Sequence, residues 1–279
     1  MNATDALNRP ANELGALLRQ WRDRRGKSQF DLSLDTGISQ RHISFIESGR
    51  SVPSRQALME IAQGLEVPLR ERNFLLLAAG YAPVYPDAAW DAPEMRQVTQ
   101  ALDRMLRQHE PYPAMVMDRH WNVLQTNQAA PEFFGLFVDL SKRAAPRNLL
   151  DLIFDPAGLR PFIVNWEDLS KALLERVRRE AVGRVIDGEM KALLAKLAAY
   201  SDVQPTGPEM AGAAAPAMPI IPVRFVWQGA CLSYFSMVAT VGTPQTIAAQ
   251  ELRLECMFPA DDATEAAHRK LPRKAVLTH

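Results

Sequence analysis

The chain has few cysteines and no long hydrophobic run. Only Cys231 and Cys256 occur among 279 residues, and they lack the spacing of paired metal ligands, which argues against a zinc finger or a disulfide scaffold. No stretch approaches the ~20 apolar residues of a membrane-spanning helix, and Asp5, Arg9 and Glu13 interrupt any apolar signal segment. We expect a cytoplasmic protein with no membrane partner. Its cysteines should be buried, inert thiols, with a redox sensor as the alternative.

The sequence also lacks an excess of charge of either sign. Lys and Arg number 32, and Asp and Glu number 32. Residues 12–80 nevertheless hold ten basic residues against eight acids, whereas residues 81–279 hold 21 against 23. Only the first segment therefore suits a polyanionic partner.

Motifs of the common enzyme classes are missing. The chain has no glycine-rich phosphate loop, nucleophile elbow or zinc-binding helix. His109, His120 and His268 are too scattered to form a recognisable metal or acid–base set. We expect no enzyme activity, no catalytic residue, no metal and no cofactor; a haem held by His120 is the alternative.

A helix-turn-helix pattern is present at residues 28–50. Ser28 and Ser39 can each cap a short helix, and Gly37 can supply the left-handed turn between the two helices. Ile43 and Ile46 recur at helical spacing and should face inward. The pattern predicts two short helices with a polar outer face on the second.

That outer face carries the chemistry that reads bases in a major groove. Gln pairs bidentately with adenine, Arg pairs with guanine, and an apolar ring can meet a thymine methyl group. Arg50 follows the helix-ending Gly49 at the height of a phosphate. For any one residue, a solvated helix face is the alternative, and His42 suits a phosphate-side position better than base contact. The expected face comprises Gln40, Arg41, His42, Ser44 and Phe45.

Five helices separated by caps and turns of this kind resemble the lambda-repressor-like, or XRE-type, helix-turn-helix domain of phage repressors and bacterial regulators. The resemblance covers residues 12–80. It implies that Gln29 contacts a phosphate and that Gln40, Arg41 and Ser44 read bases, while Phe45 departs from the polar residue often found there. It also implies that Arg22 and Glu47 tie the first helix to the end of the recognition helix; two unrelated surface charges are the alternative. Ser28 and Ser39 complete the expected DNA-binding set.

The rest of the chain alternates short strands and helices. Asn127 should cap a short helix that follows two strands and a turn. Helices are expected at 95–109, 149–154, 166–183 and 187–200, and strands at 114–117, 122–126, 223–227, 232–241 and 250–258. We expect these parts in order: a disordered N-terminus at 1–11, a DNA-binding domain at 12–80, a Pro-containing linker at 81–94, a second domain at 95–262 with a flexible Pro-rich insertion at 204–222, and a disordered tail at 263–279.

Several short motifs in the second domain resemble the MmyB-like family of regulators. They are WNVL at 121–124, NQAA at 127–130, RNLL at 147–150, FDP at 154–156 and Trp166. The resemblance implies a PAS-like ligand-binding domain that takes a small apolar metabolite, with a fatty acid as the candidate. The expected fold class is therefore an all-α five-helix domain followed by an α+β PAS-like domain with an antiparallel sheet.

Aromatic residues are the candidates to line a ligand pocket, because apolar pockets are lined in this way. Core packing is the alternative for each of them. Arg147 could meet a ligand carboxylate bidentately, and its alternative is an ion pair with Asp151. The expected ligand-binding set is Trp121, Phe133, Phe134, Phe137, Arg147, Asn148, Phe154 and Trp166.

These observations favour a ligand-responsive transcription regulator. One recognition helix reads few base pairs, so we expect a homodimer on a near-palindromic operator in double-stranded DNA. The alternative is a constitutive helix-turn-helix regulator whose second domain serves only dimerisation or binding of a protein partner. A fully packed second domain without a cavity would favour this alternative.

Overall fold

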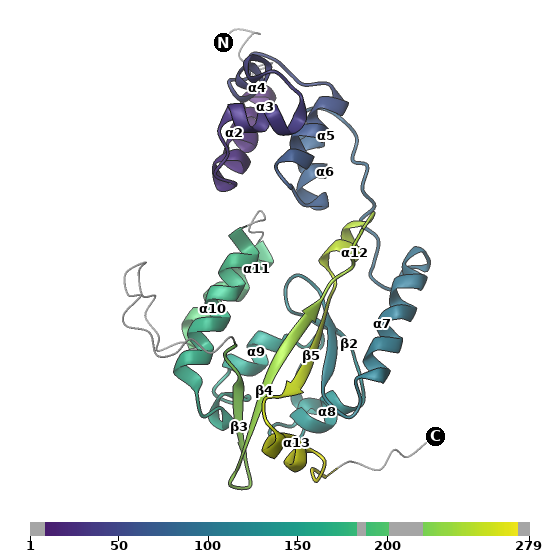
Figure 1. Ribbon diagram of the computed structural model, residues 1–279, viewed down its shortest axis with the longest axis vertical. Helices are drawn as coiled ribbons and strands as arrows, with labels where there is room; N and C mark the ends of the chain where they lie inside the picture. The colour runs from purple at the N-terminus through teal and green to yellow at the C-terminus, as the bar shows by residue number, and fades with distance from the viewer. Residues whose placement is uncertain (1–8, 183–187, 201–219, 273–279) are drawn as a thin grey trace. The chain divides into compact units, whose positions relative to one another are not determined.

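The computed structural model describes residues 9–182, 188–200 and 220–272. These residues form two compact units, the first made mainly of the chain up to Ala88 and the second mainly of the chain from Ala89 on (Figure 1). Within the described ranges, no helix has both the length and the apolar character to cross a membrane.

The first unit has the predicted five helices. Its first helix begins at Arg9, so the predicted disordered segment 1–11 extends too far. Ser28 and Asp31 form a capping box at the start of the second helix, and Gly37 ends that helix with φ of 70°. The five-helix prediction is confirmed by α2 (Arg9–Arg24), α3 (Gln29–Thr36), α4 (Gln40–Glu47), α5 (Arg55–Gly64) and α6 (Leu69–Ala78).

One apolar core joins these helices. Leu14, Leu18 and Trp21 recur on one side of α2, as an amphipathic helix requires, and all three are buried. Their partners come from the other four helices and the turns between them: Leu32, Ile43, Ile46, Leu58, Ile61, Leu65, Leu75 and Leu76. The core buries one face of α4 and leaves the opposite face exposed to solvent.

Gly15 is a point of close approach between α2 and the end of α4. A Cβ atom on Gly15 would lie 2.6 Å from the carbonyl oxygen of Glu47 and 2.7 Å from that of Ile46. Both neighbours are backbone atoms, so they cannot move aside by a change of rotamer. Glycine is needed here for close helix packing rather than for a turn.

We predict that Gly15→Ala destabilises the first unit although alanine is the better helix former by about 1 kcal/mol. Overpacking against backbone should dominate and lower the free energy of unfolding by about 2 kcal/mol net. Urea denaturation measures the change. The control is Gln20→Ala on the exposed face of the same helix, which should stay within about 0.5 kcal/mol of the parent. A Gly15→Ala protein more stable than the parent would refute the close approach.

The segment that follows α6 is bound to the first unit. The side chain of Asn73 accepts a hydrogen bond from the N–H of Tyr85 and donates one to its carbonyl. Arg70 pairs with both carboxylate oxygens of Asp87, at 2.6 and 2.9 Å. The predicted linker at 81–94 is therefore too long, because its first half, through Asp87, is held by side chains of α6.

The chain from Ala89 on is an α+β unit, which confirms the predicted class. The cap position of the helix that begins at Ala129 is held by Gln128 rather than by the predicted Asn127. The Asn127 amide oxygen nevertheless accepts hydrogen bonds from the N–H of Ala130 in the first helical turn and from that of Ala114 in a strand, and so joins the helix to the sheet. The elements are η1 (Pro93–Met95), α7 (Arg96–Gln108), β1 (Ala114–Met117), β2 (Val123–Thr126), α8 (Ala129–Phe134), η2 (Leu140–Lys142), α9 (Leu149–Phe154), η3 (Arg160–Phe162), α10 (Trp166–Val182), α11 (Gly188–Tyr200), β3 (Val223–Trp227), β4 (Ala230–Ala239), α12 (Ile247–Glu251), β5 (Arg253–Pro259) and α13 (Asp262–His268).

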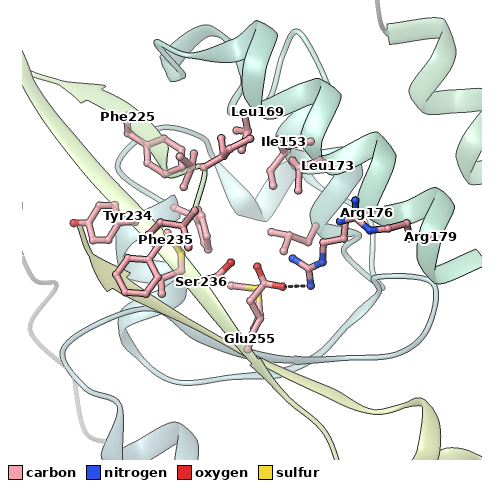
Figure 2. A pocket seen from close by; sticks show the side chains of 18 residues that line it. Ile153, Leu169, Leu173, Arg176, Arg179, Phe225, Tyr234, Phe235, Ser236 and Glu255 are labelled. Atoms are coloured by element: carbon pink, nitrogen blue, oxygen red, sulfur yellow. Dashed lines mark hydrogen bonds and ion pairs between the residues drawn. The ribbon is translucent and has the colours of Figure 1, made fainter. Parts of the chain in front are cut away.

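The strands form one antiparallel sheet in the order β2-β1-β5-β4-β3. In its register Glu255 lies opposite Met115 on one side and Val238 on the other, and Met257 lies opposite Ser236. Paired residues project from the same face of a sheet. This face, with Glu255 and Met257 at its centre, is the one that α9 and α10 approach (Figure 2).

Three expectations for the end of the chain are wrong. The strand predicted at 250–258 starts at Arg253, because residues 247–251 form α12. The predicted disordered tail contains α13, which Asp261 caps and which places His268 in the core, 2.6 Å from the hydroxyl of Tyr234. Cys231 is exposed rather than buried, because it lies on the outer side of β4. Of the predicted insertion at 204–222, residues 204–219 lie outside the described part of the chain.

Candidate functional site

The recognition helix α4 presents the face that its sequence predicts. Ile43 and Ile46 are buried, whereas Gln40 and Arg41 are exposed. His42, Ser44 and Phe45 are half-buried beside them, and Ser39 caps the helix by accepting a hydrogen bond from the N–H of His42. The helix therefore offers an amide and a guanidinium to solvent on a rigid support.

Phe45 lies beside two guanidinium groups. The Cζ atom of Arg41 is 5.3 Å from the centre of the Phe45 ring, and that of Arg50 is 6.0 Å from it. The carbonyl of Phe45 also accepts the N–H of Arg50 at 2.8 Å. Cation–π attraction of this kind orients long side chains that would otherwise move freely. The Phe45 ring thus lies within cation–π range of both arginines.

The end of α4 is anchored by the carboxylate of Glu47, whose side chain is 2% exposed. Arg22 donates from Nε to one oxygen at 2.7 Å and from Nη2 to the other at 3.1 Å. Arg22 also donates to the carbonyl of Lys27 at 2.8 Å. The predicted tie between Arg22 and Glu47 is confirmed as a bidentate, nearly buried ion pair.

Gln29 joins the same network, which the sequence did not indicate. Its Nε2 donates to Oε2 of Glu47 at 2.9 Å. A carboxamide nitrogen carries two N–H groups, so a second N–H can still donate to a phosphate. Ser28, the neighbouring cap, is exposed at the start of the same helix. Glu47 thus orients the amide of Gln29, and the phosphate contact stays a prediction.

The pKa of Glu47 reflects opposing effects. Burial alone raises the pKa of the carboxyl group. Hydrogen bonds from Arg22 and Gln29 and the charges of Arg22 and Arg19 outweigh burial, so the pKa falls below its ordinary value of 4.5. The hydrogen bond to Glu47 raises the pKa of Arg22 against the effect of its own burial. The pair is ionised wherever the protein is folded near neutral pH.

We predict that Glu47→Gln lowers the free energy of unfolding by about 3 kcal/mol at pH 7, since removing one partner of a buried ion pair leaves the other uncompensated. The folded-state pKa is depressed, so this stabilisation is complete above the ordinary value of 4.5 and is lost as the pH falls through the folded value. The difference in the free energy of unfolding between parent and variant should therefore disappear at acid pH. Chemical denaturation at several pH values measures it.

The matched control is Glu60→Gln, which changes an exposed glutamate of α5. It should stay within about 0.5 kcal/mol of the parent at every pH. If the difference in the free energy of unfolding between the parent and Glu47→Gln stayed constant from neutral to acid pH, the charge of Glu47 would not be the source of the stability.

The second unit contains a cavity of about 390 Å³ between the sheet and two helices. Figure 2 shows Ile153, Leu169 and Leu173 on the helical wall, facing Phe225 and Phe235 across the space. Most of the lining is apolar. The remaining residues of the lining are Met115, Phe134, Leu149, Ala172, Arg176, Arg179, Ile220, Ile221, Val223, Tyr234, Ser236, Glu255 and Met257.

One end of the cavity is polar. Arg176 of α10 donates from Nη2 to Oε2 of Glu255 on β5 at 3.1 Å. The Cζ atom of Arg176 also lies 4.4 Å from the ring centre of Trp121, and the Cζ atom of Arg253 lies 6.0 Å from the same centre. Trp121 adopts a left-handed backbone, φ 68°, in the turn after β1. The hydroxyl of Tyr234 instead bonds to His268, away from the cavity (Figure 2).

Only Phe134 of the predicted ligand-binding set lines this cavity. Phe133 and Phe137 pack against Phe225, at ring-centre distances of 5.4 and 5.1 Å. Phe154 packs edge-on against Trp166 at a ring-centre distance of 5.0 Å, and the ring of Trp121 contacts the guanidinium of Arg176. The core alternative therefore describes most of these aromatic residues.

Arg147 and Asn148 line a different cleft, also of about 390 Å³, beside α11. Arg147 donates to the carbonyl of Leu140 at 3.1 and 3.2 Å, while Asp151 pairs with Lys196 at 2.6 Å, so the predicted pair between Arg147 and Asp151 is not formed. Asn148 caps α9. The structure does not bring either residue to the apolar cavity.

Sequence reasoning missed the cavity residues of α10 and β5. Leu169, Leu173 and Arg176 follow one another at helical spacing, and the apolar part of that stripe was visible. Glu255 was the better signal, because a glutamate in the middle of a predicted apolar strand must find a partner if it points inward. In the parts of the chain that the structure describes, no three His, Cys, Asp or Glu side chains gather closely enough to hold a metal ion.

A helix-turn-helix domain followed by an α+β domain with an apolar cavity defines a class of protein, the ligand-sensing transcription regulators. Residues 13–75 match the family model of a helix-turn-helix domain, and residues 98–271 match that of the MmyB-like transcription regulator ligand binding domain. The second match covers more than half of the chain, so this chain belongs to the MmyB-like family. No curated protein matches it in sequence.

Proposed function

We propose that this regulator binds operator DNA through α4 and that a small apolar metabolite, a fatty acid or a related acyl compound, changes its affinity for DNA from the cavity of the second unit. The observation that carries the proposal is the apolar cavity, built from α9, α10 and the sheet within a ligand-binding family. Its volume of about 390 Å³ falls within the roughly 300 to 1,000 Å³ of small-molecule sites.

A homodimer on a near-palindromic site is the DNA-bound state that we propose. A single α4 reaches few base pairs, and two-fold protein symmetry matches two half-sites about one helical turn, roughly 34 Å, apart. The expected footprint on an XRE-type operator is symmetric. Protection of a single asymmetric half-site would contradict the dimer.

We predict that Arg41→Ala weakens operator binding by about 1 to 3 kcal/mol and relaxes preference at one base position, because a guanidinium that reads a base is lost. Gln29→Ala should instead weaken binding to all sequences alike, as loss of a phosphate contact does. Binding selection from a randomised operator library measures both effects. The control is Arg104→Ala, an exposed arginine of α7. Unchanged affinity and preference in Arg41→Ala would show that the reading face lies elsewhere.

The cavity favours ligand sensing over a constitutive regulator. A domain that serves only dimerisation or a protein partner gains nothing from an interior space, because empty volume costs packing energy. The cavity walls also come from three helices and four strands, so a ligand that contacts them can stabilise one arrangement of α10 against the sheet. A ligand shifts such an equilibrium only by its difference in affinity for the two states.

We predict that medium- and long-chain acyl compounds bind the full chain and change operator affinity by about 1 to 3 kcal/mol, the usual size of an allosteric coupling. Ala172→Phe, which fills the cavity, should abolish both effects, and Phe134→Ala, which alters its wall, should weaken acyl binding. Calorimetry and operator titration with and without ligand measure them. Tight acyl binding with unchanged operator affinity would remove the switch and leave the binding site.

A further inference from the structure

The polar end of the cavity holds a compensated charge rather than a lone cation. Glu255 faces the interior from the middle of β5, with a side chain 9% exposed, and the side chain of its partner Arg176 is 22% exposed. Both belong to the cavity lining. Figure 2 shows them meeting at the side of the cavity where Ser236 also points.

Arg176 is held in place from two sides. Glu255 accepts from its Nη2 at 3.1 Å, and the indole ring of Trp121 lies 4.4 Å from its Cζ atom. Trp121 is 1% exposed, so this platform cannot turn away without opening the core. Guanidinium groups that are both stacked and paired have little freedom to reorient toward a new partner.

Arg179 is the other cation in the described lining, and it is directed toward solvent. Its side chain is 73% exposed, and its guanidinium lies 4.0 Å from the carboxylate of Glu175 on the surface of α10. Figure 2 shows it at the margin of the cavity. A surface charge of this kind is screened by water and salt and adds little to the binding of an anion.

Binding of a ligand carboxylate at this end of the cavity would be unfavourable in either of two arrangements. It either displaces Glu255 from Arg176, which leaves a buried carboxylate unpaired, or it shares the guanidinium and becomes a second negative charge beside Glu255. A neutral head group avoids both costs. The Glu255 carboxylate has acceptor positions beyond the one that Arg176 occupies, and the Ser236 hydroxyl can donate or accept beside it.

We propose that the cavity selects acyl compounds with an uncharged head group that donates a hydrogen bond, such as a primary acyl amide or a long-chain alcohol, over the free carboxylate. The Arg176–Glu255 pair determines this preference, with Glu255 as the acceptor for the head group. The inference rests on the proposed function, since it specifies the ligand class of the same cavity.

The test compares dodecanamide, dodecanol and dodecanoate, which share one chain length, for binding to the full-length protein at neutral pH by calorimetry. The amide and the alcohol should bind at least about tenfold more tightly than the carboxylate, a ratio that corresponds to about 1.4 kcal/mol. This comparison needs no variant, so it holds even if a substitution impairs folding.

Glu255→Gln then tests the cause. It removes the negative charge at nearly constant shape and leaves Arg176 uncompensated, so dodecanoate should gain about tenfold or more in affinity. Dodecanamide should bind more weakly, because a carboxamide oxygen is a poorer acceptor than a carboxylate. The gain of dodecanoate binding also shows that the variant is folded. The matched control is Glu175→Gln, a glutamate that is 68% exposed on the same helix as Arg176; it should leave the order of the three ligands unchanged.

The outcomes separate this inference from the proposed function. Binding of dodecanoate as tight as that of the neutral compounds in the parent protein would overturn the head-group preference and leave acyl binding intact. An unchanged ligand order in Glu255→Gln would likewise overturn the role of the ion pair. If none of the three compounds bound the parent, the proposed acyl site itself would fail.

Discussion

The buried carboxylate of Glu47 is the contact on which the geometry of the DNA-binding unit depends. It lies at the last residue of α4, and Arg22 from α2 and Gln29 from α3 both donate to it. The apolar core fixes how deep α4 sits, but apolar contacts are not directional. Charge-assisted hydrogen bonds are directional, so Glu47 determines how α4 is rotated and where the amide of Gln29 points.

A second nearly buried ion pair has the corresponding role in the ligand-binding unit. Arg176 and Glu255 connect α10 to the central strand β5 at the polar end of the cavity. A pair in this position contributes less to stability than to specificity, because its desolvation offsets much of its attraction. In the first unit the pair holds the end of the recognition helix, and in the second it places two opposite charges at one end of the cavity.

The functional side chains of the two units thus come from the chain in different ways. The face proposed to bind DNA is a set of exposed and half-buried side chains on one short helix, and the guanidinium groups of Arg41 and Arg50 lie 5.3 and 6.0 Å from the ring of Phe45. The cavity has no such local origin. Its walls come from α8, α9, α10 and four strands, which meet only because the antiparallel sheet brings β1, β5 and β4 side by side.

Local rules were sufficient for the helix-turn-helix unit. Ser28, Ser39 and Gly37 determine where α3 and α4 begin and where the turn lies, because capping and left-handed turns depend on neighbours within a few residues. Sequence patterns also located most helices and strands of the second unit. They failed at α12 and α13, short segments that carry weak periodicity and whose helical state depends on what they pack against. His268 of α13, buried against Tyr234, is such a contact.

The patterns of the sequence and its family resemblances indicated the class of both domains, the recognition helix and the tie between Arg22 and Glu47. Only the tertiary structure decided which apolar residues enclose a space and which fill the core, so that Phe133, Phe137 and Phe154 pack solidly while Ile153, Leu173 and Met257 line a cavity. The reason is physical. The hydrophobicity of a side chain indicates that it will be removed from water. A cavity, however, is the volume that side chains from distant segments leave unfilled. No single segment of the sequence therefore determines where a cavity lies.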